Sequence, residues 1–123
     1  MRKYLLLITL FTGLIVSAWS LSIYDIQYTA SPGSDNTYPS PYAGNRVSTE
    51  GIVTAVNYKS GGFFISEAVA GPFSGLLVLD RRSDVRVGDR IRISGLVQES
   101  FGMTTLQDVT ALSILERNHP LPI

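Results

Sequence analysis

The chain has 123 residues, carries ten basic and ten acidic side chains, and contains no cysteine. This length supports one domain with a single modest core. The lack of cysteine excludes disulfide bonds, thiolate chemistry and a lipid anchor on a modified cysteine. The even charge balance argues against the strongly basic surface of a dedicated duplex-DNA binder, so nucleic-acid binding would have to depend on local side-chain placement.

The first twenty residues, 1–20, have the order of a secretory signal peptide. Arg2 and Lys3 precede an almost wholly apolar run from Tyr4 to Val16, and Ala18-Trp19-Ser20 offers small residues at the two positions that signal peptidase recognises. The apolar run has about 13 residues, fewer than the ~20 that a bilayer span needs, which favours cleavage over a membrane anchor. We therefore expect a secreted or periplasmic mature chain that begins at Leu21, has a net charge near −2 and is not held in a membrane.

Residues 21–45 are expected to form an extension that precedes the main domain. Ser22 to Tyr28 has alternating character and is interpreted as a short strand. Thr29 to Gly44 is dense in Pro, Ser, Gly and Asn, which do not hold regular structure. This second segment is interpreted as a long ordered loop or a flexible lead-in.

The segment 46–116 changes to β-branched and apolar runs separated by short turns, and residues 117–123 form a Pro-rich tail. Short turns with almost no helix between them favour an all-β barrel over a sandwich. Five strands are predicted: Val47 to Val56, Gly62 to Glu67, Gly75 to Asp80, about Asp89 to Ser100, and Met103 to Glu116, the last open to a break near Asp108.

The strand that follows Gly88-Asp89 shows the clearest period-2 alternation. Ile91, Ile93 and Gly95 share one face, while Arg90 and Arg92 lie on the other. A glycine inside a strand marks a bulge, a bend or a close backbone approach, and Gly51 in the first strand has the same position. The alternation of the strands predicts these core residues: Val47, Val53, Phe63, Ile65, Val78, Ile91, Ile93 and Val97.

Four stretches carry a family resemblance: RVSTEGIVTAV, GFFISE, GLLVLD and VRVGDRIRISGLVQESFGMTTL. Together with the opening IYDIQYTASPGSDNTYPSPYAG, they resemble the oligonucleotide/oligosaccharide-binding (OB) domain of secreted bacterial nucleases, over roughly residues 23–116. The resemblance implies a five-stranded Greek-key OB barrel with an N-terminal strand and loop extension. In that family an endonuclease/exonuclease/phosphatase domain follows, whereas this sequence ends at Ile123. Hydrolytic activity is therefore not carried over, and both a free-standing module and the front of a larger or split gene stay open.

The sequence offers little for catalysis of its own. Metal-dependent phosphodiester hydrolysis needs clustered carboxylates and usually a histidine. The only histidine, His119, is expected to be a solvated residue of the tail. Asp80, Asp84 and Asp89 are interpreted as turn and strand-end residues rather than metal ligands. We therefore expect no enzyme activity, no metal and no cofactor.

OB folds bind ligands across their second and third strands, between the loops that follow the first and fourth strands. Exposed aromatic rings beside cations are what single-stranded nucleic acid requires, because rings stack on bases and cations contact phosphates. Leu77 and Leu79 would accompany this face. The predicted nucleic-acid-binding residues are Tyr58, Lys59, Phe64, Ser66, Arg90, Arg92 and Phe101.

An alternative for each of these residues is a structural role. The N-terminal segment could cover Phe64 and the leucines, and Arg90 and Arg92 could pair with Glu50 or Glu99. The Arg81-Arg82 pair is interpreted as a solvated turn rather than a phosphate clamp.

The leading functional hypothesis is an exported, non-catalytic, monomeric OB module that binds single-stranded DNA or RNA, as an accessory or detached domain of an extracellular nuclease. The first alternative is a small periplasmic OB protein that binds another ligand, cationic or sugar, or acts in envelope stress. The second alternative is a structural domain that docks on a partner protein.

Overall fold

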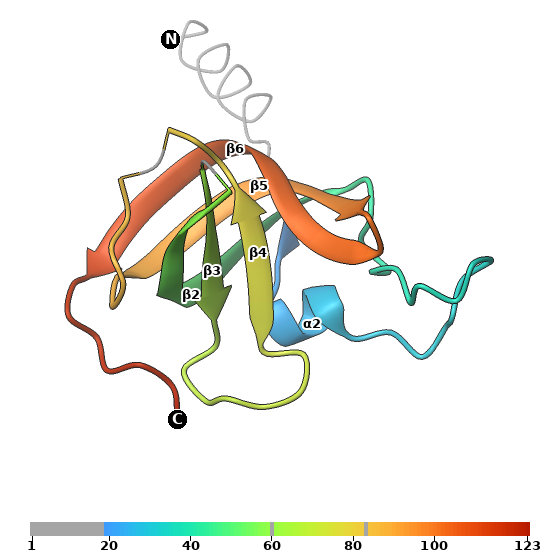
Figure 1. The fold of residues 1–123 in the computed structure, drawn as a ribbon, viewed down its shortest axis with the longest axis horizontal. Coiled ribbons are helices and arrows are strands. Elements are labelled where there is room, and N and C mark those ends of the chain that lie inside the picture. The colour runs from blue at the N-terminus through green and yellow to red at the C-terminus, as the bar shows by residue number, and fades with distance from the viewer. Residues whose placement is uncertain (1–18, 60, 83) are drawn as a thin grey trace, which may run out of the picture.

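The computed structural model describes residues 19–59, 61–82 and 84–123 (Figure 1). Of the expected signal peptide, only Trp19 and Ser20 fall in these ranges. In the part of the chain that is described, no helix is both long enough and apolar enough to cross a membrane. The elements are β1 (Trp19–Ser20), α2 (Ile23–Gln27), β2 (Arg46–Tyr58), β3 (Gly62–Ser66), β4 (Gly75–Leu79), β5 (Arg90–Ser100) and β6 (Met103–Glu116).

Strands β2 to β6 form a closed five-stranded barrel. β3 pairs antiparallel with both β2 and β4. β4 pairs parallel with β6, and β5 pairs antiparallel with both β6 and β2. The parallel β4–β6 contact, with Leu77 opposite Thr105, and the β2–β5 contact close the sheet on itself. The predicted all-β, five-stranded OB barrel is confirmed, and the strand bounds differ from the prediction by a few residues at most.

The barrel interior contains the predicted core. All eight residues expected there are at most 2% exposed. Gly95 and Gly51 permit close packing: a Cβ on Gly95 would lie 2.8 Å from the carbonyl oxygen of Gln107, and one on Gly51 would lie 3.0 Å from Cβ of Ile65. Leu76 and Leu106, which are also fully buried, complete the packing across β4 and β6.

The last strand, β6, is irregular near the expected position. Asp108 has a φ of 47°, and the β5–β6 register shifts between the pairs Ser94–Ala111 and Leu96–Gln107. The extra residues on β6 form a bulge, which lets the long strand bend around the barrel. The strand is thus kinked but continuous.

The interpretation of Ser22 to Tyr28 as a strand is wrong, because residues Ile23–Gln27 form helix α2. Ser22 caps this helix: its hydroxyl accepts a hydrogen bond from the Asp25 backbone N–H, and the Asp25 carboxylate accepts one from the Ser22 N–H. Ile23 and Ile26 are three residues apart, share one helix face and are fully buried in the barrel core. Figure 1 shows α2 beside the start of β4, where it covers one end of the barrel.

The Pro-rich segment 29–44 is anchored to the barrel in its second half, as an ordered loop would be. Ser40 is 5% exposed, and its hydroxyl donates to the carbonyl oxygen of Ile26. Its backbone N–H donates to the carboxylate of Glu99, and the Gly44 N–H donates to the carbonyl oxygen of Val97. These bonds connect the loop to α2 and β5.

Candidate functional site

A groove of about 250 Å³ lies between β4 and the β5–β6 hairpin, and we call it the β4 groove. In the numbering of this chain, β3 and β4 are the second and third barrel strands, which are the strands that form the ligand face of OB folds. The loops that border this face are the β2–β3 loop and the β5–β6 hairpin, and both contribute to the groove. Its lining residues are Tyr58, Lys59, Leu77, Leu79, Ser100, Phe101, Met103 and Thr105.

Two aromatic side chains border the groove from opposite loops. Phe101 occupies the hairpin turn with a φ of 51°, and its ring is fully exposed to solvent. Tyr58 ends β2 and packs edge-on against Phe64, with ring centroids 5.3 Å apart. Lys59 Nζ lies 5.6 Å from the centroid of the Tyr58 ring. One ring of the groove is therefore free and the other is held in place by its neighbours.

Phe64 and Leu77 form the base of this region instead of an exposed surface. They oppose each other across β3 and β4. Leu77 is only 5% exposed, so the expectation of an exposed Leu77 surface is wrong, whereas Leu79 is half-buried. Phe64 is half-buried beneath Tyr58 and supports that ring.

A second cation, Arg81, lies beside the β2–β3 loop but lines a different pocket, together with Asp80 and Asp84. Because Gly62 opposes Leu79 in the β3–β4 ladder, Arg81 comes to lie against Gly61, where an added Cβ would be 3.1 Å from Arg81 Cα. In the part of the chain that is described, no carboxylate pairs with Lys59 or Arg81. The antiparallel register of β3 and β4 places Arg81, which the sequence assigns to a solvated turn, beside this loop.

Arg82, the neighbour of Arg81, has a structural role. Its Nε lies 3.3 Å from the Asp80 carboxylate, and its Nη2 donates to the carbonyl oxygen of Val109 at 2.7 Å. Both arginines are exposed in a bend, as the solvated-turn interpretation expects, and Arg82 in addition bonds to Asp80 and Val109.

Arg90 and Arg92 lie on a different part of the barrel from the groove. On β5 they oppose Ile52 and Glu50 of β2. Arg92 Nη2 lies 2.8 Å from Glu50 Oε2, Arg90 Nη1 lies 3.1 Å from Glu50 Oε1, and Arg90 Nε lies 3.1 Å from Glu116 Oε1. The structure thus has the pairing with Glu50 that the sequence left open, and the prediction that these arginines join the aromatic residues on one face is wrong.

Besides Phe64, which packs against Tyr58 but does not line the groove, Ser66 is the other predicted site residue that the groove does not include. It is 9% exposed, and its hydroxyl donates to the carbonyl oxygen of Glu67. It lines a separate pocket of about 180 Å³ with Ile52 and Arg90 among its neighbours. The expectation that Ser66 points onto the ligand face is therefore wrong.

Two of the three aspartates near β4 and β5, Asp80 and Asp89, are used in local structure, Asp80 through Arg82. Asp89 is 1% exposed, accepts a hydrogen bond from the Arg86 N–H and lies 3.5 Å from Arg117. Within residues 19–59, 61–82 and 84–123, no three His, Cys, Asp or Glu side chains are grouped so that they could hold a metal ion. The side chain of His119 is 26% exposed and its backbone N–H donates to the Gly88 carbonyl, so it packs against the barrel more closely than a solvated tail residue would.

No protein-family model and no curated protein matches the sequence. Solved structures with a similar fold include the telomere capping protein Ten1 from S. pombe, at 16% identity over 80% of this chain and 81% of that one, with a TM-score of 0.48. A chain of the S. pombe Stn1–Ten1 complex matches at 15% identity over 81% of this chain and 78% of its own, with a TM-score of 0.50. The hypothetical protein YgiW from E. coli matches at 14% identity over 59% and 77%, with a TM-score of 0.46. At such low identities the likeness concerns the fold alone, and it agrees with the strand topology: this chain has an OB fold.

Proposed function

We propose that the protein is an OB-fold binding module that takes single-stranded nucleic acid in the β4 groove. One observation carries the proposal: the free ring of Phe101 and Lys59, which has no carboxylate partner in the described chain, both line the groove on the OB ligand face. Rings that stack on bases and cations that contact phosphates are the two elements of sequence-tolerant single-strand binding.

The small number of unpaired cations predicts weak and salt-sensitive binding. Each phosphate contact on a single strand contributes a slope of about −0.7 to the logarithm of affinity against the logarithm of salt concentration. Lys59 would therefore give a slope of about −0.7. Most of the remaining free energy would come from stacking and from contact with the apolar groove walls, Leu79 and Met103.

The test is fluorescence anisotropy of a labelled oligo-dT strand with the purified protein at several salt concentrations. Phe101→Ala should weaken binding about five- to a hundredfold, because one stacked base is worth ~1–3 kcal/mol. Phe73→Ala is the matched control, since Phe73 is 44% exposed but lies outside the groove. An affinity too weak to detect at low salt, or an equal loss in both variants, would contradict the proposal.

A second candidate ligand is an apolar segment of a partner protein. The observation that favours it is the composition of the groove, in which Leu77, Leu79, Phe101 and Met103 accompany a single lysine. Phe101→Ala would then abolish capture of the partner, and the protein would show no affinity for oligo-dT at any salt concentration.

We also propose that the protein is exported and that it acts beside a nuclease catalytic domain. The order of residues 1–20 supports export, and the family resemblance supports a role beside a nuclease catalytic domain. Mass spectrometry of the protein from a periplasmic or culture fraction tests the first, because cleavage after Ser20 leaves a chain that begins at Leu21. A nuclease-domain sequence in frame with this gene or adjacent to it tests the second.

The protein is further proposed to have no hydrolytic activity of its own. Assays with DNA, RNA and bis-nitrophenyl phosphate in the presence of Mg²⁺, Mn²⁺ or Ca²⁺ should stay at background. Turnover that disappears in Asp80→Ala or Asp84→Ala would contradict this and would identify a metal site at those carboxylates.

A further inference from the structure

The turn of the β5–β6 hairpin holds Phe101 in an unfavourable backbone conformation. Phe101 and Gly102 are the two residues between β5 and β6, and their φ angles are 51° and 77°. Positive φ at both central residues is typical of a type I′ turn, in which Asn-Gly is a preferred pair. A bulky side chain rarely adopts this conformation, and the Phe101 ring is fully exposed, so burial does not offset the strain. Strain of this kind persists only where the surroundings fix the residue, and it is concentrated at functional sites.

Glu99, two residues before the turn, connects the hairpin to the Pro-rich segment. Glu99 opposes Thr104 in the β5–β6 ladder, and Thr104 Oγ1 donates a hydrogen bond to Glu99 Oε2 at 2.6 Å. The same oxygen accepts a hydrogen bond from the backbone N–H of Ser40 at 3.1 Å. Ser40 and Thr104 are both buried, so water competes little for these donors. One carboxylate oxygen therefore holds the two strands of the hairpin and a neighbouring loop together.

The Pro-rich segment also lies beside the turn itself (Figure 1). A Cβ on Gly102 would lie 3.8 Å from Cγ2 of Thr37, which is ordinary van der Waals distance. Thr37 is in turn fixed locally, because its backbone N–H and its hydroxyl both donate to the carboxylate of Asp35. The hairpin thus has a neighbour along one side, and Glu99 supplies a polar bond to it.

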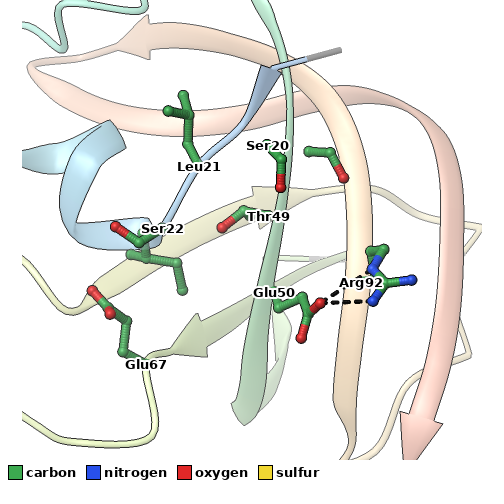
Figure 2. Close-up of a pocket in the computed structure, with 9 residues that line it drawn as sticks. Ser20, Leu21, Ser22, Thr49, Glu50, Glu67 and Arg92 are labelled. Atoms are coloured by element: carbon green, nitrogen blue, oxygen red, sulfur yellow. Dashed lines mark hydrogen bonds and ion pairs between the residues drawn. The ribbon is translucent and has the colours of Figure 1, made fainter. Parts of the chain in front are cut away.

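Glu99 makes these contacts as a hydrogen-bond acceptor and not as one half of an ion pair. Figure 2 shows the contrasting case of Glu50, whose carboxylate bonds to Arg92 at 2.8 Å. Within residues 19–59, 61–82 and 84–123, no basic side chain pairs with Glu99. Its Oε1 is buried and has no hydrogen-bond partner among those residues. The position therefore uses the acceptor geometry of Oε2 rather than the negative charge.

We propose that Glu99 is a positioning residue, which fixes the β5–β6 hairpin against the Pro-rich segment so that the Phe101 ring is presented at the β4 groove. Loss of Glu99 releases Ser40 and Thr104 together, and the strained turn can then relax. A ring that is free to move loses that freedom when it stacks on a ligand, which weakens binding. The effect on a ligand rests on the proposed binding of single-stranded nucleic acid, whereas the effect on the hairpin does not.

The first experiment measures the order of the hairpin in the free protein by ¹⁵N relaxation. Glu99→Ala should lower the order parameters of the Phe101 and Gly102 amides from about 0.85 to below about 0.6, the range of flexible backbone. Glu99→Gln keeps an acceptor oxygen and should leave these amides ordered. Gln98→Ala is the matched control, because its side chain is exposed at the neighbouring position of β5. Unchanged order in Glu99→Ala, or an equal loss in Gln98→Ala, would overturn the proposal.

A second variant removes only one of the two bonds to Glu99. Thr104→Val keeps the β-branched shape of the side chain and deletes its hydroxyl donor. Its order parameters at Phe101 and Gly102 should fall between those of the wild type and Glu99→Ala. This variant decides the question where circular dichroism shows that Glu99→Ala does not fold, and full order in it would then count against the proposal.

The second experiment separates positioning from charge, by fluorescence anisotropy of a labelled oligo-dT strand. Glu99→Ala and Glu99→Gln both remove the negative charge, so the difference between them reports the lost acceptor. Glu99→Ala should bind about three- to tenfold more weakly than Glu99→Gln, which is less than the full loss of a stacked base. In a Phe101→Ala background this difference should disappear, because no ring is left to position.

An equal difference in both backgrounds would overturn the proposal, since Glu99 would then affect binding without Phe101. Equal affinities of Glu99→Ala and Glu99→Gln in the presence of Phe101 would overturn it as well. A wild-type protein without affinity for oligo-dT at low salt would instead contradict the proposed function, and the order of the hairpin would then decide by itself whether Glu99 positions Phe101.

Discussion

The β4 groove and the charged patch on β2 and β5 differ in how their cations are used. In the groove, Lys59 has no carboxylate partner within the described chain. In the patch, Arg90 and Arg92 both pair with Glu50. The strand pattern assigns outward positions to residues of both regions, but it does not say which of them face each other across a ladder. Cross-strand register decides whether an exposed cation is available to a ligand.

The largest expected effect concerns the barrel that holds both regions. Ile93 on β5 is fully buried and opposes Thr49 on β2 and Leu112 on β6. Ile93→Ala should lower the free energy of unfolding by ~2–5 kcal/mol, the usual range for a buried large-to-Ala change. Chemical denaturation measures this loss. Unchanged stability would mean that β5 presents the opposite face to the core.

The next largest effect concerns the ladder between β5 and β6, where Gly95 packs closely against Gln107. A methyl group at Gly95 would lie 2.8 Å from the carbonyl oxygen of Gln107, a backbone atom that cannot easily move away. Gly95→Ala should therefore lower the free energy of unfolding by ~1–3 kcal/mol, in the range of overpacked cores. Hydrogen exchange should show more opening of β5 and β6 than of β3. Equal loss of protection in β3, β5 and β6 would argue against a local clash.

The fold could be predicted from the sequence because strand alternation and mid-strand glycines are local signals. The barrel buries the alternating apolar residues and packs closely at Gly51 and Gly95. Helix α2 was missed because Ser22 to Tyr28 is short enough to fit both periods. The spacing of Ile23 and Ile26, together with the Ser22–Asp25 capping pair, is the signal that favours a helix.

The candidate site could be predicted only in part, because it depends on which strands become neighbours. Tyr58, Lys59 and Phe101 follow from the positions of the two loops and do line the groove. The pairing of Arg92 does not follow from alternation, since its partner Glu50 is supplied by β2.

A smaller effect tests the comparison directly through the salt dependence of oligonucleotide binding. Lys59→Ala should make the slope of affinity against salt shallower by about 0.7, one phosphate contact on a single strand. Arg92→Ala should leave that slope unchanged, because Arg92 pairs with Glu50 away from the groove. Fluorescence anisotropy at four or more salt concentrations measures both. A shallower slope in Arg92→Ala would show that the patch contacts the nucleic acid after all.

The smallest expected effect is on stability, from the patch itself. The side chains of Arg92 and Glu50 are 58% and 44% exposed, so water and salt screen the attraction between them. Exposed pairs of this kind contribute about 0–1 kcal/mol, and Arg92→Ala should therefore change the free energy of unfolding by no more than that. Glu50→Gln should cost slightly more, because it leaves two arginines side by side without their shared carboxylate. Thermal denaturation at low and high salt measures both variants, and the difference between them should shrink as salt is added. A loss above about 2 kcal/mol in Arg92→Ala would mean that Arg92 stabilises the barrel by more than its exposed ion pair with Glu50.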